Sequence, residues 1–570
     1  MVLVVPDKPA DLPDSPLLAR IRAGVIGDDE VLPGPFGPRR ITYADYTASG
    51  RALTFLEEFV EREVLPRYAN THTESSGTGL QTTRLREDAR TLIRQAVHGD
   101  DTTCVVFCGS GATGAIDKLV GVLNLRLPAD LDQRYGLRDH IPAEERPVVF
   151  IGPFEHHSNE LPWRESIADV VTIHEDADGH VDIAQLRAEL TRFGDRPLKI
   201  GSFSAASNVT GIITDVDAVT RVLHEHGALA FWDYAAAGPY VDIDMAPADP
   251  AIAKDAVFLS PHKFVGGPGA AGVLIARREL FTNTVPDVVG GGTVAYVNPD
   301  EHRYLADAEH REEAGTPGIL GSIRAGLVFQ LKSAVTTDVI NAHERDFVRR
   351  AVQVWGANPA IEILGNVHAD RLSITSFVIR GQGGYLHHNF VVSVLNDLFG
   401  IQSRGGCSCA GPYGHRLLGI DLATSHEFER EITGGCEGIK PGWVRVSFNF
   451  FISEAVFAYL LSAVDLIARN GQRLLPLYRF DVLTGLWHHR QGVAEPPLRL
   501  GDLRYTDDGV LRYASDHPRA PEFALAEYLS EAEEMLRRLP EPDLTAADLT
   551  PDFEHLRWFP LPAVCLAEAG

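Results

Sequence analysis

The sequence predicts an α/β fold with a mostly parallel sheet covered by helices. Two observations carry this prediction: seven short β-rich runs alternate with amphipathic helical stretches, and a smaller α/β pattern follows after residue 330. Alternation of this kind is typical of βαβ units. The seven runs are Cys104–Cys108, Val148–Ile151, Val170–Ile173, Leu198–Phe203, Ala228–Trp232, Ala256–Leu259 and Ala271–Ala276.

Changes in composition divide the chain into four predicted regions. The first is rich in Pro, Gly and Asp, and the last is rich in Leu, Asp and Pro with no legible function. The third has strand-like runs at Leu372–Ile379 and Val444–Phe448 and a helical run at Asn389–Leu398. The regions are an N-terminal arm (1–50), a large domain (51–330), a small α/β domain (331–475) and a C-terminal extension (476–570).

The composition is that of a globular protein and excludes several function classes. Of 570 residues, 45% are hydrophobic and 23% are charged, which is enough for a large core. The net charge of −26 argues against a nucleic acid or an anionic membrane as partner, because both attract clustered Lys and Arg. Six cysteines are too few for a secreted disulfide framework, and no signal peptide or membrane-spanning run is visible. We therefore expect a soluble, cytoplasmic protein.

A glycine-rich turn, CGSGATG at Cys108–Gly114, lies between a predicted strand and a predicted helix. Exposed N–H groups at a helix N-terminus bind phosphate, so this turn predicts an anion cradle. It also matches G-x-G-x-x-G, but Asp130 and Asp132 do not lie at a strand end, where a dinucleotide site needs its acidic residue. Taken alone, the motif is equally consistent with a tight helix entry that binds nothing.

Two further strand ends carry polar residues. FWDYAAA ends a strand at Asp233, and a carboxylate there points into the usual ligand crevice of an open α/β sheet. Ser260-Pro261-His262-Lys263 follows the next strand, where a lysine among small residues loses solvent and its amine becomes free for Schiff-base chemistry. Taken singly, such an aspartate is more often a helix cap and such a lysine a solvated surface residue.

A phosphate cradle, an aspartate able to pair with a pyridinium nitrogen and a Schiff-base lysine together suit a pyridoxal-phosphate site. In this order they resemble aminotransferase class V, a family of fold-type I pyridoxal-phosphate enzymes, in its cysteine desulfurase and selenocysteine lyase branch. The resemblance covers about Tyr43 to Leu466. It implies the fold-type I architecture, with a smaller α/β domain and here a C-terminal extension, and pyridoxal 5′-phosphate as cofactor.

The resemblance implies roles for individual residues around the cofactor. Lys263 would hold it covalently, Asp233 would protonate its pyridine nitrogen, His156 would stack on its ring and Asn208 would bond its phenolic oxygen. By themselves, His156 is more often structural and Asn208 could simply shape a turn. The phosphate contacts would come from Ala112, Thr113, Ser260, His262 and, reaching the neighbouring subunit of a homodimer, Thr316.

Three further positions match residues on the substrate side of the family's site. Arg404 and Arg445 match arginines that hold the substrate carboxylate through paired hydrogen bonds, and His72 matches a further active-site histidine. One position departs from the family. Its D-G-A-Q block ends here at Ala236, which cannot make the hydrogen bond of a glutamine to the phenolic oxygen.

Two cysteines lie in the loop RGGCSCAGP, at Cys407 and Cys409. One Cys-x-Cys pair is at most half a zinc site and no matching Cys-x-x-Cys exists, so no metal is predicted. A nearby arginine and exposed glycine backbone favour a thiolate, although free cysteines often only pack. In the family, a cysteine of this loop attacks the substrate sulfur. Cys409 aligns with that nucleophile, and the role of Cys407 stays open.

These features predict a pyridoxal-phosphate-dependent cysteine desulfurase, which converts L-cysteine to L-alanine and keeps the sulfur as a persulfide on Cys409. A β-lyase, a selenocysteine lyase, an aminotransferase or an epimerase would keep the cofactor but change the reaction. A non-catalytic scaffold of the same fold is the remaining alternative. A molybdenum-cofactor sulfurase would carry a longer C-terminal domain. A sulfur-acceptor protein would be the partner besides a second subunit, with no nucleic acid or membrane involved.

Overall fold

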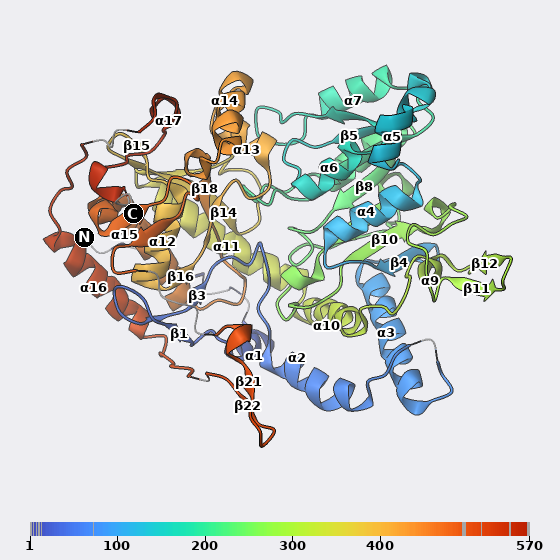
Figure 1. The fold of residues 1–570 in the computed structure, drawn as a ribbon, viewed down its shortest axis with the longest axis horizontal. Coiled ribbons are helices and arrows are strands. Elements are labelled where there is room, and N and C mark those ends of the chain that lie inside the picture. Colours follow the sequence, from blue (N-terminus) through green and yellow to red (C-terminus); the bar gives the residue numbers. More distant parts are fainter. Residues whose placement is uncertain are drawn as a thin grey trace.

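The computed structural model describes residues 14–71, 73–492, 498–514, 516–545 and 549–566, together with residues 3, 5, 6, 8, 9 and 12. Two α/β units lie side by side, and both chain ends lie on the side of the second unit (Figure 1). Within the described residues, no helix combines the length and the apolar character needed to cross a bilayer.

The first unit is built on a seven-stranded sheet with the order β4-β10-β9-β8-β7-β5-β6. Neighbouring strands are parallel except at β10, which runs antiparallel to both β9 and β4. The predicted α/β class with a mostly parallel sheet is therefore confirmed, and all seven predicted runs are strands of this sheet. They are β4 (Thr103–Phe107), β5 (Val148–Ile151), β6 (Asp169–Thr172), β7 (Lys199–Ser204), β8 (Leu229–Asp233), β9 (Ala256–Leu259) and β10 (Val273–Arg277).

Alternate residues of these strands enter two separate cores, one on each face of the sheet. Phe231 and Phe258 pack with helix α4 in one core, whereas Trp232 and Val257 pack with α3, α8 and α10 in the other. A sheet buried on both faces has near-continuous apolar strands, which is why the sequence showed apolar runs without alternation. The helices of this unit are α3 (Gly77–Ala96), α4 (Ala112–Val122), α5 (Ala129–Tyr135), α6 (Leu161–Arg164), α7 (Ile183–Arg192), α8 (Val216–Glu225), α9 (Ala308–Arg311) and α10 (Ile319–Val335).

The second unit has an antiparallel sheet with the order β13-β14-β18-β17, and β15 pairs with β14. The predicted strands at 372–379 and 444–448 and the helix at 389–398 are present as β14, β18 and α12, with slightly different bounds. The elements are β13 (Ile361–Ile363), β14 (Ile374–Gly381), β15 (Gly384–Tyr385), β17 (Arg404–Gly406), β18 (Trp443–Ser447), α11 (Thr337–Gly356), α12 (His388–Phe399), α13 (Gly411–Leu417), α14 (Leu422–Thr433) and α15 (Glu454–Asn470).

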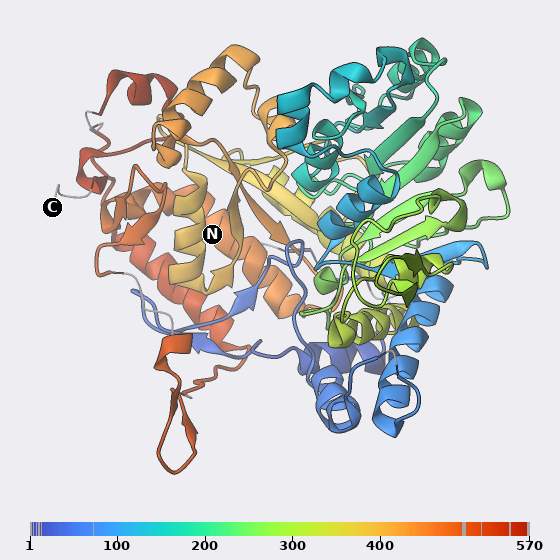
Figure 2. The same ribbon diagram turned by 45° about the vertical axis from the view of Figure 1, so that its right-hand side comes forward.

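Segments from both ends of the chain pack on this second unit (Figure 2). Near the N-terminus, β3 pairs in parallel with β16, and residues 476–566 follow α15 with helix α16 packed against it. The hairpin β21–β22 projects from the molecule in both views. The remaining elements are α1 (Pro16–Gly24), β1 (Val31–Leu32), β2 (Arg39–Arg40), β3 (Thr42–Tyr43), α2 (Thr54–Phe59), β11 (Val294–Val297), β12 (His302–Tyr304), β16 (Ile401–Gln402), β19 (Tyr478–Phe480), β20 (Trp487–His489), β21 (Arg504–Tyr505), β22 (Leu511–Arg512), α16 (Ala524–Arg538) and α17 (Pro551–Leu556).

Candidate active site

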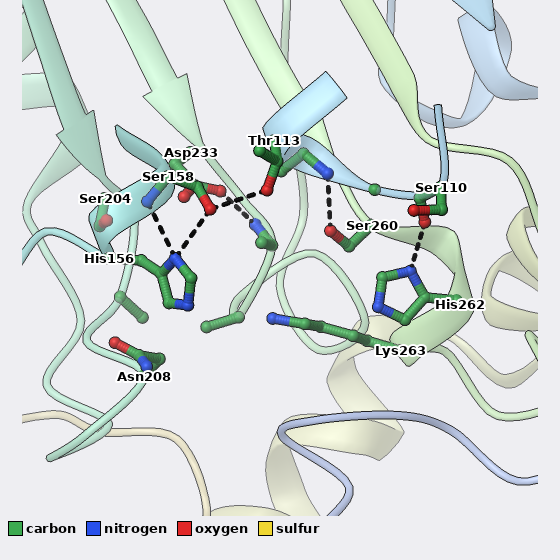
Figure 3. Close-up of a pocket in the computed structure, with 15 residues that line it drawn as sticks. Ser110, Thr113, His156, Ser158, Ser204, Asn208, Asp233, Ser260, His262 and Lys263 are labelled. Carbon is green, nitrogen blue, oxygen red and sulfur yellow. Dashed lines mark hydrogen bonds between the residues drawn. The ribbon is translucent and has the colours of Figure 1, made fainter. Parts of the chain in front are cut away.

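A cavity of about 240 Å³ lies where strands β7, β8 and β9 end and helix α4 begins (Figure 3). Ligands of open α/β sheets bind at this edge, outside the carboxyl ends of the strands. The structure brings eight of the sequence-predicted cofactor residues together as walls of this one cavity. They are Ala112, Thr113, His156, Asn208, Asp233, Ser260, His262 and Lys263.

Lys263 ends a short 3₁₀ turn that directly follows β9. Its side chain reaches across the cavity from the His262 side toward His156 and Asn208 (Figure 3). Burial lowers the pKa of this amine to about 8, against the opposing charge of Asp233. Within the described residues, Lys263 Nζ makes no hydrogen bond, so the amine is free to react.

Asp233 is the last residue of β8 and is 5% exposed. Its Oδ1 accepts a hydrogen bond from the N–H of Ala235 at 2.7 Å, and Oδ2 has no partner among the described residues. Burial raises the pKa of this carboxyl, while the Ala235 hydrogen bond and Lys263 oppose the shift. A cationic N–H donor in the cavity would satisfy the free oxygen and restore the carboxylate.

His156 is held as a neutral ring on the opposite wall. Its Nδ1 accepts the N–H of Ser158 at 3.1 Å, which leaves the ring proton on Nε2. Burial, with a smaller effect of the Lys263 charge, lowers the pKa of His156 to about 4. The preceding residue, Glu155, accepts hydrogen bonds from Ser204 and Asn159, and burial raises its pKa to about 7. The sequence reasoning gave Glu155 no role.

The start of α4 forms the predicted anion cradle. The N–H of Ala112 donates to Ser260 Oγ at 2.9 Å, and Thr113 Oγ1 lies 2.7 Å from Ser158 Oγ. At Gly111, the residue before the helix, a side chain would collide with the cradle. A Cβ built on it would lie 2.9 Å from His262 Cε1 and 3.0 Å from Ser260 Oγ, inside the cradle. Hydroxyl groups and amides at a helix N-terminus are the donors that a phosphate needs.

These residues fit pyridoxal phosphate on three separate observations. The cradle offers hydroxyl groups and a helix N-terminus for a phosphate, and the unpartnered oxygen of Asp233 suits a protonated ring nitrogen. Asn208 Oδ1 is buried without a hydrogen-bond partner among the described residues, so the cavity wall carries an unmet polar group. Ala236 also lines the cavity and adds no hydrogen-bonding group where the family has a glutamine.

The cysteine loop (residues 404–411) lies beside this cavity and is hydrogen-bonded to its wall. Asn208 Nδ2 donates to Ser408 O at 2.8 Å, and the N–H of His157 donates to Cys409 O at 2.8 Å. Cys409 is exposed and Cys407 half-buried. Ser408 and Cys409 have φ angles of +51° and +56°, a conformation that costs non-glycine residues of order 1–3 kcal/mol each and persists only where surrounding contacts impose it.

Arg404 and Arg445 are bridged by a carboxylate that the sequence reasoning missed. Asp45 Oδ1 accepts from Arg445 Nη2 at 2.9 Å, and Oδ2 accepts from Arg404 Nε at 3.0 Å. Arg445 Nη1 also donates to Asn208 O at 2.9 Å, which links this cluster to the cavity wall. Asp45 follows the short strand β3 in the N-terminal arm, and no motif marks it.

Of the other predicted residues, Arg404, Arg445 and Cys409 lie beside this cavity without lining it, and Thr316 lies apart from it. Thr316 lines a separate cavity of about 390 Å³ on the other side of α4, together with Val288 and Lys118. His72 lies outside the described residues. All six cysteines are free, and no group of three or more His, Cys, Asp or Glu side chains within the described part of the chain is placed to hold a metal ion.

Comparison with known proteins gives consistent findings. Residues 42–455 match the Aminotransferase class-V family. A probable cysteine desulfurase from Streptomyces coelicolor is 28% identical over 398 residues, which cover 68% of this chain and 88% of that protein. A cysteine desulfurase from Dickeya dadantii is 28% identical over 399 residues, covering 69% and 88%.

Solved structures share the fold. A cysteine desulfurase from Thermococcus onnurineus has a TM-score of 0.60 at 21% identity, covering 75% of this chain and 95% of that one. The cysteine desulfurase CsdA from Escherichia coli has a TM-score of 0.58 at 21% identity, covering 79% and 97%. At this level of identity the likeness establishes the fold, which is the predicted fold-type I architecture.

Proposed function

The chain belongs to the aminotransferase class V family, and on this premise we propose that it is a pyridoxal-phosphate-dependent cysteine desulfurase. The observation that carries the proposal is the hydrogen bond from Asn208 Nδ2 to Ser408 O, at 2.8 Å. It fastens the loop that carries Cys409 to the wall of the cavity that holds Lys263 and Asp233. The reactions of an aminotransferase or a β-lyase do not require a thiol beside the cavity that holds Lys263.

Pyridoxal phosphate would be held by groups that already converge on the cavity. Ser260, Thr113 and the first amides of α4 would take the phosphate, and Asp233 would pair with the ring nitrogen. His156 is uncharged at neutral pH and offers a flat ring face for stacking. When bound, the cofactor supplies an electron sink for negative charge that develops on the amino-acid substrate.

Lys263 would move protons in this site. An amine with a pKa of about 8 is partly neutral near neutral pH, so it can accept a proton from the substrate Cα and return it. Arg404 and Arg445 would hold the substrate carboxylate, with Asp45 keeping both guanidinium groups in place.

Cys409 would carry the sulfur transfer. Its thiolate attacks the sulfur of L-cysteine, so an S–S bond forms while the Cβ–S bond of the substrate breaks. The electron pair of the broken bond stays with the three-carbon product, which takes up protons and leaves as L-alanine. Cys409 keeps the sulfur as a persulfide, and no external oxidant is needed. The exposure of Cys409 leaves this sulfur accessible to an acceptor protein.

The chain would act as a homodimer. Thr316, which lies away from the cavity of its own subunit, would reach the phosphate site of the partner. Val288 lines the same cavity as Thr316 and belongs to a group of large apolar side chains that are exposed between residues 285 and 297, and exposed apolar surface marks protein interfaces. The exposed side chains of this group are Val285, Val288, Val289, Tyr296 and Val297.

The test is to incubate the purified holoenzyme with L-cysteine and a reductant and to quantify alanine, pyruvate and sulfide. Alanine and sulfide in equal amounts are expected. Cys409→Ser should abolish alanine formation, whereas Cys407→Ser, the matched control two residues away, should keep most of it. Pyruvate as the main product would instead identify a β-lyase. Undiminished alanine from Cys409→Ser would exclude the assigned nucleophile.

A further inference from the structure

The family match ends at residue 455, so the C-terminal extension (476–570) lies beyond it and has no role in the reaction described so far. Residues of the extension nevertheless pack against the part of the second unit that carries the cysteine loop. Trp558, just after α17, stacks on His388 with an interplanar angle of 20° and a ring-centroid distance of 5.9 Å. It also stacks on the neighbouring His387 at 19° and 5.3 Å.

His388, the first residue of α12, connects Trp558 to the cysteine loop. The structure leaves no room between this ring and the loop backbone. A Cβ built on Gly405 would lie 3.1 Å from His388 Nδ1, and one built on Gly442 would lie 2.6 Å from His388 Cδ2 and 2.8 Å from Gly406 Cα. Glycine at 405 and 442 therefore lets His388 pack directly against β17 and the residue before β18.

The extension also fixes the backbone on the other side of His388. Trp558 Nε1 donates to Ile439 O at 3.0 Å, and His388 Nε2 lies 3.3 Å from Lys440 O. Earlier in the extension, Val482 O accepts from the N–H of Gly438 at 2.9 Å. Residues 438–440 lead into β18, which pairs with β17. Strand β17, which leads into the two cysteines, therefore contacts His388, and the residues before its neighbour β18 contact the extension.

The loop needs such support, because Ser408 and Cys409 both adopt positive φ angles. Two consecutive residues of this kind relax unless contacts on all sides oppose the change. On the side of the large sheet, Asn208 and His157 provide these contacts. On the opposite side, the ring of His388 packs against the glycines that precede Cys407, and Trp558 stacks on His388.

We propose that the C-terminal extension is a brace for the cysteine loop, in which Trp558 and His388 are positioning residues that hold Cys409 in its place beside the cavity. The consequence for catalysis rests on the proposed desulfurase function, while the effect on the loop itself does not. The brace gives the extension a function within the reaction, because misplacing a nucleophile by about 1 Å costs up to about a hundredfold in rate.

The experiment uses the full-length holoenzyme and three variants. Trp558→Ala removes the stack, Trp558→Phe keeps an aromatic face, and Tyr505→Ala removes an aromatic side chain of the same extension that is 80% exposed. Cleavage after Arg404 and Arg416 gives one peptide, 405–416, that contains both loop cysteines. The rate of Cys409 alkylation by iodoacetamide is read on this peptide, and hydrogen exchange of residues 405–416 is read on fragments from an acid protease; both report on the loop without any substrate.

Trp558→Ala is expected to speed exchange of residues 405–416 and alkylation of Cys409 by about tenfold, with β14 unchanged. With L-cysteine, kcat is expected to fall about tenfold while KM stays within about twofold. Trp558→Phe should recover most of both effects, and Tyr505→Ala should show neither.

Unchanged exchange and alkylation in Trp558→Ala would overturn the proposal, as would faster exchange throughout the second unit including β14, which marks general destabilisation. An equal effect of Tyr505→Ala would also overturn it. If the wild type fails to release alanine but the loop responds to Trp558→Ala as expected, the desulfurase assignment fails and the brace stands.

Discussion

Lys263 and Asp233 share one cavity, and burial moves the pKa of each group toward its neutral form. For the lysine this direction makes the amine reactive near neutral pH. For the aspartate it means that the carboxylate is only fully stabilised once a positive partner is bound. Under the proposed function, the two residues would together suit an aldehyde cofactor whose ring nitrogen is protonated when bound.

The lowered pKa of Lys263 predicts how cofactor loading depends on pH. Only the neutral amine attacks the aldehyde, so the rate at which the apoprotein takes up pyridoxal phosphate should rise about tenfold per pH unit below the pKa and level off above about pH 8. Stopped-flow absorbance measures this rate. A rate that does not change between about pH 6 and about pH 9 would contradict the assignment, and Lys263→Ala is the control without covalent uptake.

Asp45 predicts a second effect at the scale of one residue. Asp45→Asn leaves Arg445 buried without its counter-ion, so the free energy of unfolding should fall by about 3 kcal/mol. A carboxylate ligand can replace the lost charge, so L-alanine should raise the Tm of the variant more than that of the wild type. Thermal unfolding with and without L-alanine measures both. A variant as stable as the wild type would show that Asp45 does not hold the arginines.

At the scale of elements, the start of α4 decides whether phosphate fits. Gly111→Ala places a methyl group 2.9 Å from His262 Cε1 and 3.0 Å from Ser260 Oγ, so the Kd for pyridoxal phosphate should rise about tenfold. Gly77→Ala, at the first position of α3 with no atom within 4 Å of the added carbon, is the matched control. Equal Kd values in a fluorescence titration of the two variants would place the phosphate elsewhere.

The sequence predicts elements well where local pattern and burial agree. Each strand of the large sheet is a short apolar run because both of its faces are covered, and the turns that follow carry the polar groups of the site. The antiparallel direction of β10 was not predictable, because an apolar run has no direction of its own. The composition of the N-terminal arm (1–50) indicated few regular elements, although its strand β3 pairs with β16.

Two contacts at or near the site could not be predicted from the sequence, because each joins residues that are far apart in the chain. Asp45 and Trp558 act through partners about 400 and 170 residues away in the chain, and no local spacing encodes such pairs. Lys263, Asp233 and the cradle were predictable because each lies directly at a strand end or helix start, where position follows from topology.

At the scale of the whole molecule, the exposed valines near Thr316 predict a subunit interface. Val288→Glu puts a charge into this apolar surface, next to the cavity that Thr316 lines, and should shift the protein from dimer to monomer. Its Kd for pyridoxal phosphate should rise as well, because Thr316 would no longer reach the partner.

Light scattering after size-exclusion chromatography measures the mass of the wild type and of the variant. Leu500→Glu, at a side chain that is 89% exposed in the extension, should remain dimeric. A wild type that is monomeric would contradict the interface.

The central claim is that Cys409 takes the substrate sulfur. The most direct test mixes the holoenzyme with less than one equivalent of L-cysteine and no reductant, then determines alanine and the mass of peptide 405–416. The account predicts one alanine released for each sulfur atom gained by the peptide, with the added sulfur located on Cys409 by fragmentation. Alanine without added sulfur on the peptide, or sulfur carried only by Cys407, would contradict it.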